Sequence, residues 1–437
     1  MEVSYLAEAE DTTKKYGPLT DDLLRNTLRK DKGDAAELVS WKCEDFTKKG
    51  DNYASFVTSV KVQYREAKEG ALKEASYVAK IAHQLEMETK FRSITNEVFE
   101  KEGCCFIEIL PKMNQAMREL HLDAIRTAEG YCVSLELGKE VLMVEDLRAR
   151  HFKMCDRRRG MDVLHATLVL KELGRMHAAS LVVEKLGCSL TETWPVIVEK
   201  WVHREDSSID MFIKILAAQF EGAAMIMEKI PKYEHVVEWI RELKPRAMQI
   251  FKDALLQGLK FSVLTHGDCW SNNVLFRYDA EGAPVEVMLV DLQGMRMASA
   301  GTDLSYFLYS SFTGNIRKNN FNAFITTYYD SFSSVLQAAG MPVPFSQEEL
   351  LQELRDKMTF GCVLGMIFAP IVLSEEQDII GFFDISEETI DKDSQERQET
   401  VTRIGERGDG QLRDRFLSMF DEMVEAGIVS RADAAAQ

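Results

Sequence analysis

Apolar and polar residues alternate over residues 56–64, and this period of two is typical of a half-buried β-strand. The turn-forming triplet Gly50-Asp51-Asn52 comes just before it. Shorter runs of the same kind predict further strands over residues 76–82 and 140–144. Lys80 falls inside the first of these runs, so a cation interrupts an otherwise apolar strand. The first third of the chain is therefore expected to contain β structure.

Most of the remaining chain has the apolar spacing of helices, with residues recurring every three or four positions. Helices are expected over 98–113, 163–184, most of 185–260 and most of the chain after residue 291. Two short strands are expected over 261–264 and 285–290. The first fifty residues are polar with helical stretches, and the acidic segment 387–406 is expected to be mobile.

The length of the chain predicts two lobes. Its 437 residues exceed the roughly 250 to 300 residues that one hydrophobic core usually serves. We place the boundary after Leu147, which gives an N-lobe of residues 1–147 and a C-lobe of residues 148–437. Apolar residues make up 46% and charged residues 28%, so the chain is neither disordered nor fibrous.

Charge and cysteine usage exclude several classes of function. The formal net charge of −18, from 53 basic and 71 acidic residues, repels nucleic acid and anionic lipid, so neither is expected as a partner. The longest charge-free apolar stretch, 358–374, is shorter than the ~20 residues of a membrane span and contains Pro370. The N-terminal segment lacks the pattern of a secretory signal, and the cysteines form no CxxC pair. A reducing, cytoplasmic compartment is expected.

The residues that indicate chemistry lie in HGDCWSNNVLF, residues 266–276, and VEVMLVDLQG, residues 285–294. Asp268 and Asn273 are five positions apart, and Asp291 ends an apolar strand-like run. Phosphoryl transfer needs a carboxylate that accepts the proton of the attacking hydroxyl, and oxygen ligands that hold Mg²⁺ against the phosphates. We predict that Asp268 is this carboxylate and that Asn273 and Asp291 bind the metal.

These motifs belong to a wider set that resembles a known family. The set consists of GDNYASFVTSVKVQY, the strand with Lys80, FEKEGCCFIEILP, LMVEDL, LVLKELGRMHAAS, THGDCWSNNVLF and DLQGMRMASAGTDLSYFLYSS. Together they resemble the ecdysteroid kinase-like (CHK kinase-like) family, which is similar to choline kinases and aminoglycoside phosphotransferases with a protein-kinase-like fold.

The resemblance implies how ATP is held. The loop that covers the phosphates corresponds to residues 50–55, where backbone amides near Asn52 and Ser55 are expected to make the contact. This loop has one glycine and no GxGxxG pattern. Lys80 corresponds to the lysine that holds the α- and β-phosphates. The segment 144–147 resembles the linker between lobes, so Glu145 and Leu147 are expected to contact adenine.

In the family a helix glutamate pairs with the strand lysine, and two residues compete for this role. Glu97 lies with Lys101 on the wet face of the helix, whereas Glu102 lies on the apolar stripe, where a buried carboxylate needs a cationic partner. Glu102 also stands nine residues before Pro111, as the family pattern requires. We expect Glu102 and keep Glu97 as the alternative.

Three further residues of the motifs are assigned structural roles. His177 lies on the apolar face of its helix and is expected to be a core histidine under the catalytic loop. His266 is expected to hold that loop in place. The resemblance implies that Asp303 braces the same loop.

We therefore predict an α+β, two-lobed, protein-kinase-like fold, with an antiparallel sheet in the small N-lobe and a large, mainly helical C-lobe. The predicted activity is transfer of the γ-phosphate of ATP, with Mg²⁺, to a hydroxyl of a lipophilic small molecule such as an ecdysteroid or another steroid or xenobiotic. No obligate protein partner is predicted. A choline or ethanolamine kinase and an inert kinase-like binding protein are the alternatives. A protein kinase is disfavoured, because the glycine-rich loop and an APE-like segment are missing.

Overall fold

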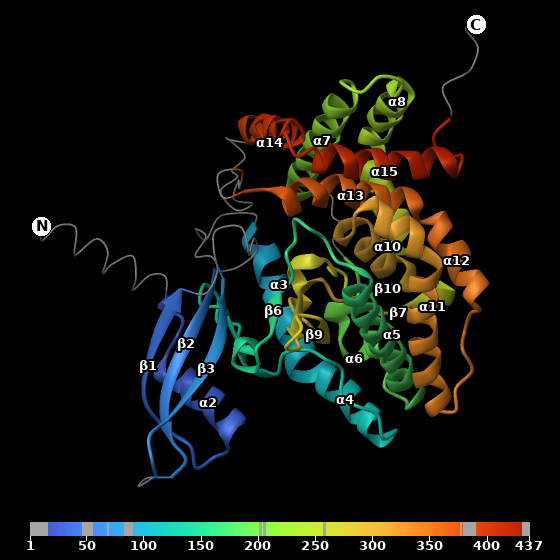
Figure 1. The fold of residues 1–437 in the computed structure, drawn as a ribbon. Coiled ribbons are helices and arrows are strands. Elements are labelled where there is room, and N and C mark those ends of the chain that lie inside the picture. Colours follow the sequence, from blue (N-terminus) through green and yellow to red (C-terminus); the bar gives the residue numbers. More distant parts are fainter. Residues whose placement is uncertain are drawn as a thin grey trace, which may run out of the picture.

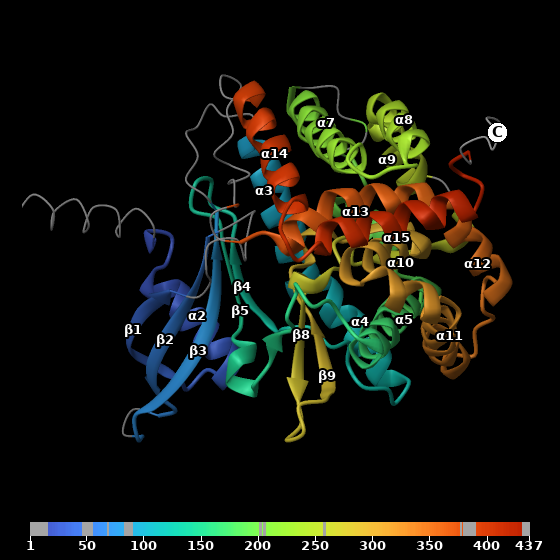
Figure 2. The ribbon, with the colours of Figure 1, turned by 45° about the horizontal axis from the view of Figure 1, so that its top comes forward.

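The computed structural model describes residues 16–45, 56–67, 70–82, 91–200, 203, 207–256, 259–375, 378 and 390–430. A β-sheet lies on one side of the molecule and a larger, mainly helical part on the other (Figures 1 and 2). The helix α3, Phe91–Cys104, lies between them.

The sheet has five strands in the order β1-β2-β3-β5-β4, and every neighbouring pair is antiparallel. The strands are β1 (Glu37–Asp45), β2 (Phe56–Arg65), β3 (Lys73–Ile81), β4 (Gly130–Ser134) and β5 (Val141–Glu145). The strands expected from alternation correspond to β2, β3 and β5.

One face of the sheet is covered by α2, Asp21–Lys32. Thr20 caps this helix by accepting a hydrogen bond from the Leu23 backbone N–H at 3.2 Å. Leu24 and Leu28 of α2 are fully buried against the sheet, in one cluster with Val60. The apolar stripe of α2 thereby forms a small core that is separate from the main one.

The opposite face packs against a long helical segment that reaches into the helical part. It runs from α3 through a π-helical turn, Cys105–Ile109, into α4, Leu110–Glu119. Phe106 of the π-helical turn is buried in the same cluster as Val78 of β3 and Val144 of β5, and α4 packs on the central helix α5. One helical segment thus contacts both the sheet and the core of the helical part.

The helical part is built around α5 and α11, which pack along each other. Its helices are α5 (Val163–Lys185), α6 (Leu190–Thr193), α7 (Ser207–Met227), α8 (Glu234–Leu243), α9 (Ala247–Leu256), α10 (Ala300–Ser311), α11 (Gly314–Ala338), α12 (Gln347–Asp356), α13 (Met358–Leu373), α14 (Ile390–Gly405) and α15 (Gln411–Glu425). All residues of α10 are buried, so this helix forms the centre of the main core.

Short strands on the side that faces the sheet carry the loops with the conspicuous motifs. They are β6 (Lys153–Met154), β7 (Ser262–Thr265), β8 (Val274–Tyr278), β9 (Pro284–Leu289) and β10 (Arg296–Ser299). β8 and β9 form an antiparallel hairpin beside β6, and β7 pairs with β10.

Two expectations from the sequence are wrong. Helical stretches were expected in the first fifty residues, and α2 is one of them, but the edge strand β1 at residues 37–45, which pairs with β2, was not expected. The acidic segment 387–406 was expected to be mobile, but residues 390–405 form α14, which packs along α7 with Val401 and Ile404 buried. Apolar residues spaced three apart anchor this otherwise charged helix.

The segment 358–374, expected to be a buried helix, corresponds to α13. Among the described residues no single helix is long and apolar enough to cross a membrane, although α12 and α13, bent by 58°, pass that test as a pair.

Candidate functional site

The loop between β7 and β8 is held in place by Asp303 in the first turn of α10. The Asp303 carboxylate accepts hydrogen bonds from the backbone N–H of His266 at 2.6 Å and of Gly267 at 2.8 Å. Gly267 has φ +78°, and a Cβ atom there would lie 1.9 Å from the Gly294 carbonyl oxygen. Only glycine fits at this point of the loop.

Two buried histidines support the same loop. His177 of α5 is fully buried and links the Asp303 carboxylate, at 3.0 Å, to the Tyr328 hydroxyl, at 2.8 Å. Burial opposes the ionisation of Asp303, but the hydrogen bonds from His177 and the Gly267 backbone N–H, together with the two histidines' charges, keep the pKa of Asp303 below its usual value. The His266 ring lies 3.1 Å from the Val290 carbonyl oxygen, and burial lowers its pKa. Both histidines are placed for structural support, and neither lines the cavities described below.

Asp268 points from this loop toward Asn273 and Tyr306. The Asn273 amide donates a hydrogen bond to Asp268 Oδ2 at 2.8 Å, and the Tyr306 hydroxyl donates one to Oδ1. Burial, together with the nearby charge of Asp291, raises the pKa of Asp268 to about 7, although these two hydrogen bonds oppose the shift. A carboxylate with a pKa near neutrality is suited to accept a proton from a weakly acidic group.

Asp291 follows β9 and is brought next to Asn273 by the hairpin. The Val290 backbone N–H donates to the Asn273 carbonyl oxygen at 3.1 Å. Asp291 adopts left-handed backbone angles, φ +63° and ψ +66°, which are rare for a residue with a side chain. Such strain is commonly found at functional sites. Its carboxylate accepts a hydrogen bond from Lys80 Nζ at 2.9 Å.

Lys80 is also bound by Glu102, so it joins the sheet, α3 and the hairpin. Its Nζ lies 2.7 Å from each carboxylate oxygen of Glu102. Burial lowers the pKa of Lys80, but the carboxylates of Asp291 and Glu102 outweigh burial and the net shift is upward. Glu102 is 2% exposed and also accepts a hydrogen bond from the Leu292 backbone N–H at 3.1 Å. The structure therefore places Glu102, rather than the exposed Glu97, beside Lys80.

Lys80, Glu102 and Asp291 line a cavity of about 290 Å³ between the sheet and the helical part, which we call the interlobe cavity. Apolar residues of both parts form its walls, among them Val57, Val78, Phe106 and Leu275. Glu145 and Leu147, which were expected to contact adenine, are among its lining residues. Asn52 and Ser55, the other predicted phosphate contacts, lie outside the described residues.

A second cavity, which we call the apolar pocket, is lined by Asp268. Its volume is about 330 Å³, and Asp268, Asn273 and Asp291 form one end. Apolar residues of α7, α9, α13 and α14 form most of its remaining wall. Asn273 and Asp291 line both this pocket and the interlobe cavity, so the two cavities meet at these side chains.

Sequence reasoning missed the aromatic residues beside Asp268. Tyr306, Trp270 and Phe368 form a cluster with ring centroids 4.9 and 5.0 Å apart. Tyr306 follows Asp303 by one helical turn, so the spacing could have placed both on the face of α10 that meets the loop. Phe368 lies on α13, and no local pattern connects it with Asp268.

The oxygen atoms of Asn273 and Asp291 fit a magnesium ion. Asn273 uses its amide N–H₂ group to bind Asp268, which leaves its carbonyl oxygen for a ligand. Mg²⁺ is usually held by one or two protein oxygens together with phosphate groups and water. No cluster of three or more His, Cys, Asp or Glu side chains suited to a metal occurs among the described residues. The two oxygens of Asn273 and Asp291 match the small number of protein ligands with which Mg²⁺ is bound beside phosphates.

A comparison of the chain with protein-family models gives a match to the ecdysteroid kinase-like family over residues 49–341, about two thirds of the chain. The chain belongs to the ecdysteroid kinase-like family. Family membership indicates a kinase-like phosphotransferase. The α+β fold class predicted from the sequence, with a small antiparallel sheet and a large helical part, is confirmed.

Three solved structures that align with this chain do so at low identity and with low TM-scores. An ethanolamine kinase from Plasmodium vivax aligns with a TM-score of 0.39 and 11% identity, over 95% of this chain and 91% of that chain. A glucosamine kinase aligns with a TM-score of 0.30 and 14% identity, over 88% and 82% of the two chains. A glucosamine kinase in complex with glucosamine, ADP and inorganic phosphate aligns with a TM-score of 0.29 and 12% identity, over 89% and 94%. No curated protein matches the sequence significantly.

Proposed function

We propose that the protein is an ATP-dependent kinase that transfers the γ-phosphate to a hydroxyl of a lipophilic small molecule, such as an ecdysteroid or another steroid or xenobiotic. One observation carries the proposal: Asp268 lines a pocket suited to an apolar alcohol, and this pocket meets a cavity suited to a nucleotide at Asp291 and at Asn273, which is hydrogen-bonded to Asp268. In-line transfer between two bound reactants needs such a junction.

The interlobe cavity would hold ATP. Its apolar walls suit an adenine ring near Glu145 and Leu147, whose backbone groups would contact the base. Lys80 would hold the phosphates, and Glu102 would hold Lys80. Asn273 and Asp291 would bind Mg²⁺, which supplies neutralisation of the phosphate charge when it is bound.

Asp268 would orient the acceptor hydroxyl and accept its proton. Its Oδ1 and Oδ2 atoms are fixed by Tyr306 and Asn273, so the carboxylate cannot rotate freely. Fixing the reacting groups in one geometry supplies much of the rate enhancement in phosphoryl transfer. Tyr306 is a positioning residue in this scheme.

The apolar pocket suits a lipophilic acceptor. Leu364, Ile367 and Ile371 of α13 face residues of α7 across the pocket. The acidic side chain of Asp378 is 0% exposed and is paired with Arg403 and Arg407, so its charge is already compensated. Small-molecule pockets usually combine such apolar walls with a few polar groups at one end.

A choline or ethanolamine kinase is a second candidate. The observation that favours it is the cluster of Trp270, Tyr306 and Phe368, because aromatic rings beside a carboxylate can bind an ammonium group. An inert binding protein is a third alternative. It is disfavoured because Lys80 is hydrogen-bonded to Asp291, which also lines the pocket of Asp268.

An ATP-consumption assay across ecdysteroids, sterols, choline and phenolic glycosides tests the proposal. Turnover of a lipophilic alcohol is expected, and turnover of choline alone would favour the second candidate. Asp268→Asn should lower turnover by about 100-fold or more, because it removes the proton acceptor, and should leave ATP affinity nearly unchanged. Turnover close to wild type in this variant would contradict the assignment of Asp268.

Some broader expectations from the sequence are also kept as proposals. We propose that the lobes divide after Leu147, that the enzyme works in the cytoplasm, and that it needs no obligate protein partner. The eight cysteines, all of them without a disulfide in the structure, support a reducing compartment.

A further inference from the structure

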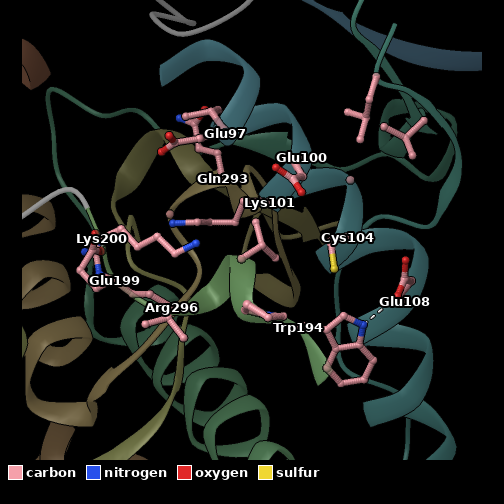
Figure 3. Close-up of a pocket in the computed structure, with 18 of the residues that line it drawn as sticks. Glu97, Glu100, Lys101, Cys104, Glu108, Trp194, Glu199, Lys200, Gln293 and Arg296 are labelled. Atoms are coloured by element: carbon pink, nitrogen blue, oxygen red, sulfur yellow. Dashed lines mark hydrogen bonds and ion pairs between the residues drawn. The ribbon is translucent and has the colours of Figure 1, made fainter. Parts of the chain in front are cut away.

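A third and larger cavity lies beside α3, where Val133 of β4 also lines it, and we call it the outer cavity. Its volume is about 930 Å³. Figure 3 shows it between α3 and the segment that carries Trp194, Glu199 and Lys200. Val98, Ile107, Val133, Val196 and Val198 are among its apolar lining residues.

The three cavities follow one another in a row. The outer cavity and the apolar pocket share Phe212, Ile215 and Gln293 in their walls. The outer cavity shares none of its described lining residues with the interlobe cavity. A molecule that presents a hydroxyl to Asp268 from the apolar pocket would therefore extend toward the outer cavity, away from the nucleotide.

The inner charges of the outer cavity include a cation without a close partner. Arg296 is 3.3 Å from the Glu199 carboxylate and donates a hydrogen bond to the Gly267 carbonyl oxygen at 3.0 Å. Lys101 forms no hydrogen bond or ion pair within the described part of the chain, and Figure 3 shows its side chain extending from α3 into the cavity. Glu97 and Glu100 line the same cavity but are exposed to solvent.

A cation that is half-buried without a close partner favours an anionic ligand. Burial lowers the pKa of Lys101, with the charge of Glu199 opposing the shift, so its ammonium group is stabilised less than it is in water. The buried Nε atom of Arg296 also has no hydrogen-bond partner among the described residues. An anion that accepted hydrogen bonds from Lys101 would compensate this charge.

We propose that the outer cavity is the distal subsite of the acceptor, and that it binds an acidic group of an amphipathic alcohol on Lys101. This inference rests on the proposed kinase function and deepens it. The acceptor class is then a lipophilic hydroxy acid, with its hydroxyl at Asp268 in the apolar pocket and its carboxylate, or a comparable anion, at Lys101. At about 330 Å³, the apolar pocket by itself is at the lower end of the range for small-molecule sites.

Equilibrium binding tests the subsite without requiring turnover. The probes are lithocholate, which has a ring hydroxyl and a distant carboxylate, a long-chain ω-hydroxy fatty acid, and the methyl ester of each. Calorimetric titrations are done on the full chain with a non-hydrolysable ATP analogue and Mg²⁺ present. At least one carboxylate should bind about tenfold or more tightly than its ester, because a charged hydrogen bond is lost in the ester.

Three variants assign this preference to the cavity. Lys101→Met should bring the carboxylate and the ester to within about twofold of each other, whereas Lys101→Arg should preserve the preference. Lys112→Met is the matched control, because it removes the same charge from an exposed position on the following helix, outside the cavity. Thermal unfolding of each variant shows that it is folded.

The outcomes separate the subsite from the kinase function. The subsite is wrong if neither carboxylate is preferred over its ester, or if Lys101→Met keeps the preference. If the protein phosphorylates neutral alcohols but Lys101 causes no preference for a carboxylate over its ester, the kinase function stands and the subsite is wrong. If Lys101 causes a preference for the carboxylate over its ester but no alcohol is phosphorylated, the subsite stands as a binding site and the kinase function is wrong.

Discussion

Glu102→Gln should weaken the use of ATP strongly, whereas Glu97→Gln should have almost no effect. Glu102 is 2% exposed, and its two carboxylate oxygens lie 2.7 Å from Lys80 Nζ. Deleting one partner of a buried ion pair costs about 3 to 5 kcal/mol. Glutamine keeps one acceptor oxygen, and Lys80 keeps Asp291 at 2.9 Å, so we expect a smaller loss of about 2 to 3 kcal/mol. That loss corresponds to roughly a 30- to 160-fold lower kcat/KM for ATP.

Steady-state kinetics with varied ATP, and calorimetric titration with ATP and Mg²⁺, measure this effect. Glu97 lies on the same helix but is exposed, so Glu97→Gln controls for the loss of a carboxylate from α3. It should change kcat/KM by no more than about twofold. If folded Glu102→Gln has a kcat/KM for ATP within threefold of wild type, the pair of Glu102 and Lys80 does not position the phosphates. If Glu97→Gln lowers kcat/KM strongly, Glu97 rather than Glu102 is the partner that matters, and the assignment is refuted.

Three further changes test other parts of the site. Asp291→Ala should remove most of the magnesium dependence of ATP affinity, because it deletes an oxygen ligand; an unchanged gain with Mg²⁺ would mean that the ion is bound elsewhere. kcat/KM should fall as pH drops below about 7, since Asp268 has a pKa of about 7 and must be ionised to accept a proton. Tyr306→Phe should move this fall to higher pH, because it removes a hydrogen bond that lowers the pKa of Asp268. A value of kcat/KM that stays constant between pH 6 and 8 would contradict the role of Asp268 as proton acceptor. Gly267→Ala should reduce activity by about 100-fold or more, because the added Cβ would collide with the Gly294 carbonyl oxygen. Gly282→Ala is the control: Gly282 also has a positive φ, +84°, but no atom lies within 4 Å of an added Cβ, so this variant tests backbone strain alone.

The sequence predicted the parts of the fold whose pattern is local. The strands β2, β3 and β5 have a period of two, and α5 has regular apolar spacing, so each segment indicated its own structure. β1 was missed because Glu37, Lys42 and Glu44 make it polar, as an exposed edge strand can be. α14 was missed because its charge suggested a solvated segment, and its packing partner α7 lies far away in the sequence.

In the candidate site, too, residues with a local sequence pattern could be predicted, whereas residues placed by the packing of distant segments could not. Asp268, Asn273 and Asp291 could be grouped because they lie within one loop and one hairpin. Glu102 could be preferred to Glu97 from helical periodicity together with its distance from Pro111. Phe368 and Lys101 could not be assigned to a site in this way. Their positions beside the apolar pocket and in the outer cavity depend on how α13 and α3 pack against distant segments, which no local pattern specifies.

The helical segment that runs from α3 through the π-helical turn into α4 has a consequence for control of the enzyme. Kinases that are switched on and off often displace the helix whose glutamate binds the strand lysine. Here that helix continues into α4, where Met113 and Met117 are fully buried in the main core. A displacement of α3 that separates Glu102 from Lys80 would require either removing these methionines from the core or bending the segment at residues 105–109. The buried methionines therefore favour the arrangement in which Glu102 stays paired with Lys80, and they leave the π-helical turn as the place where the segment could bend.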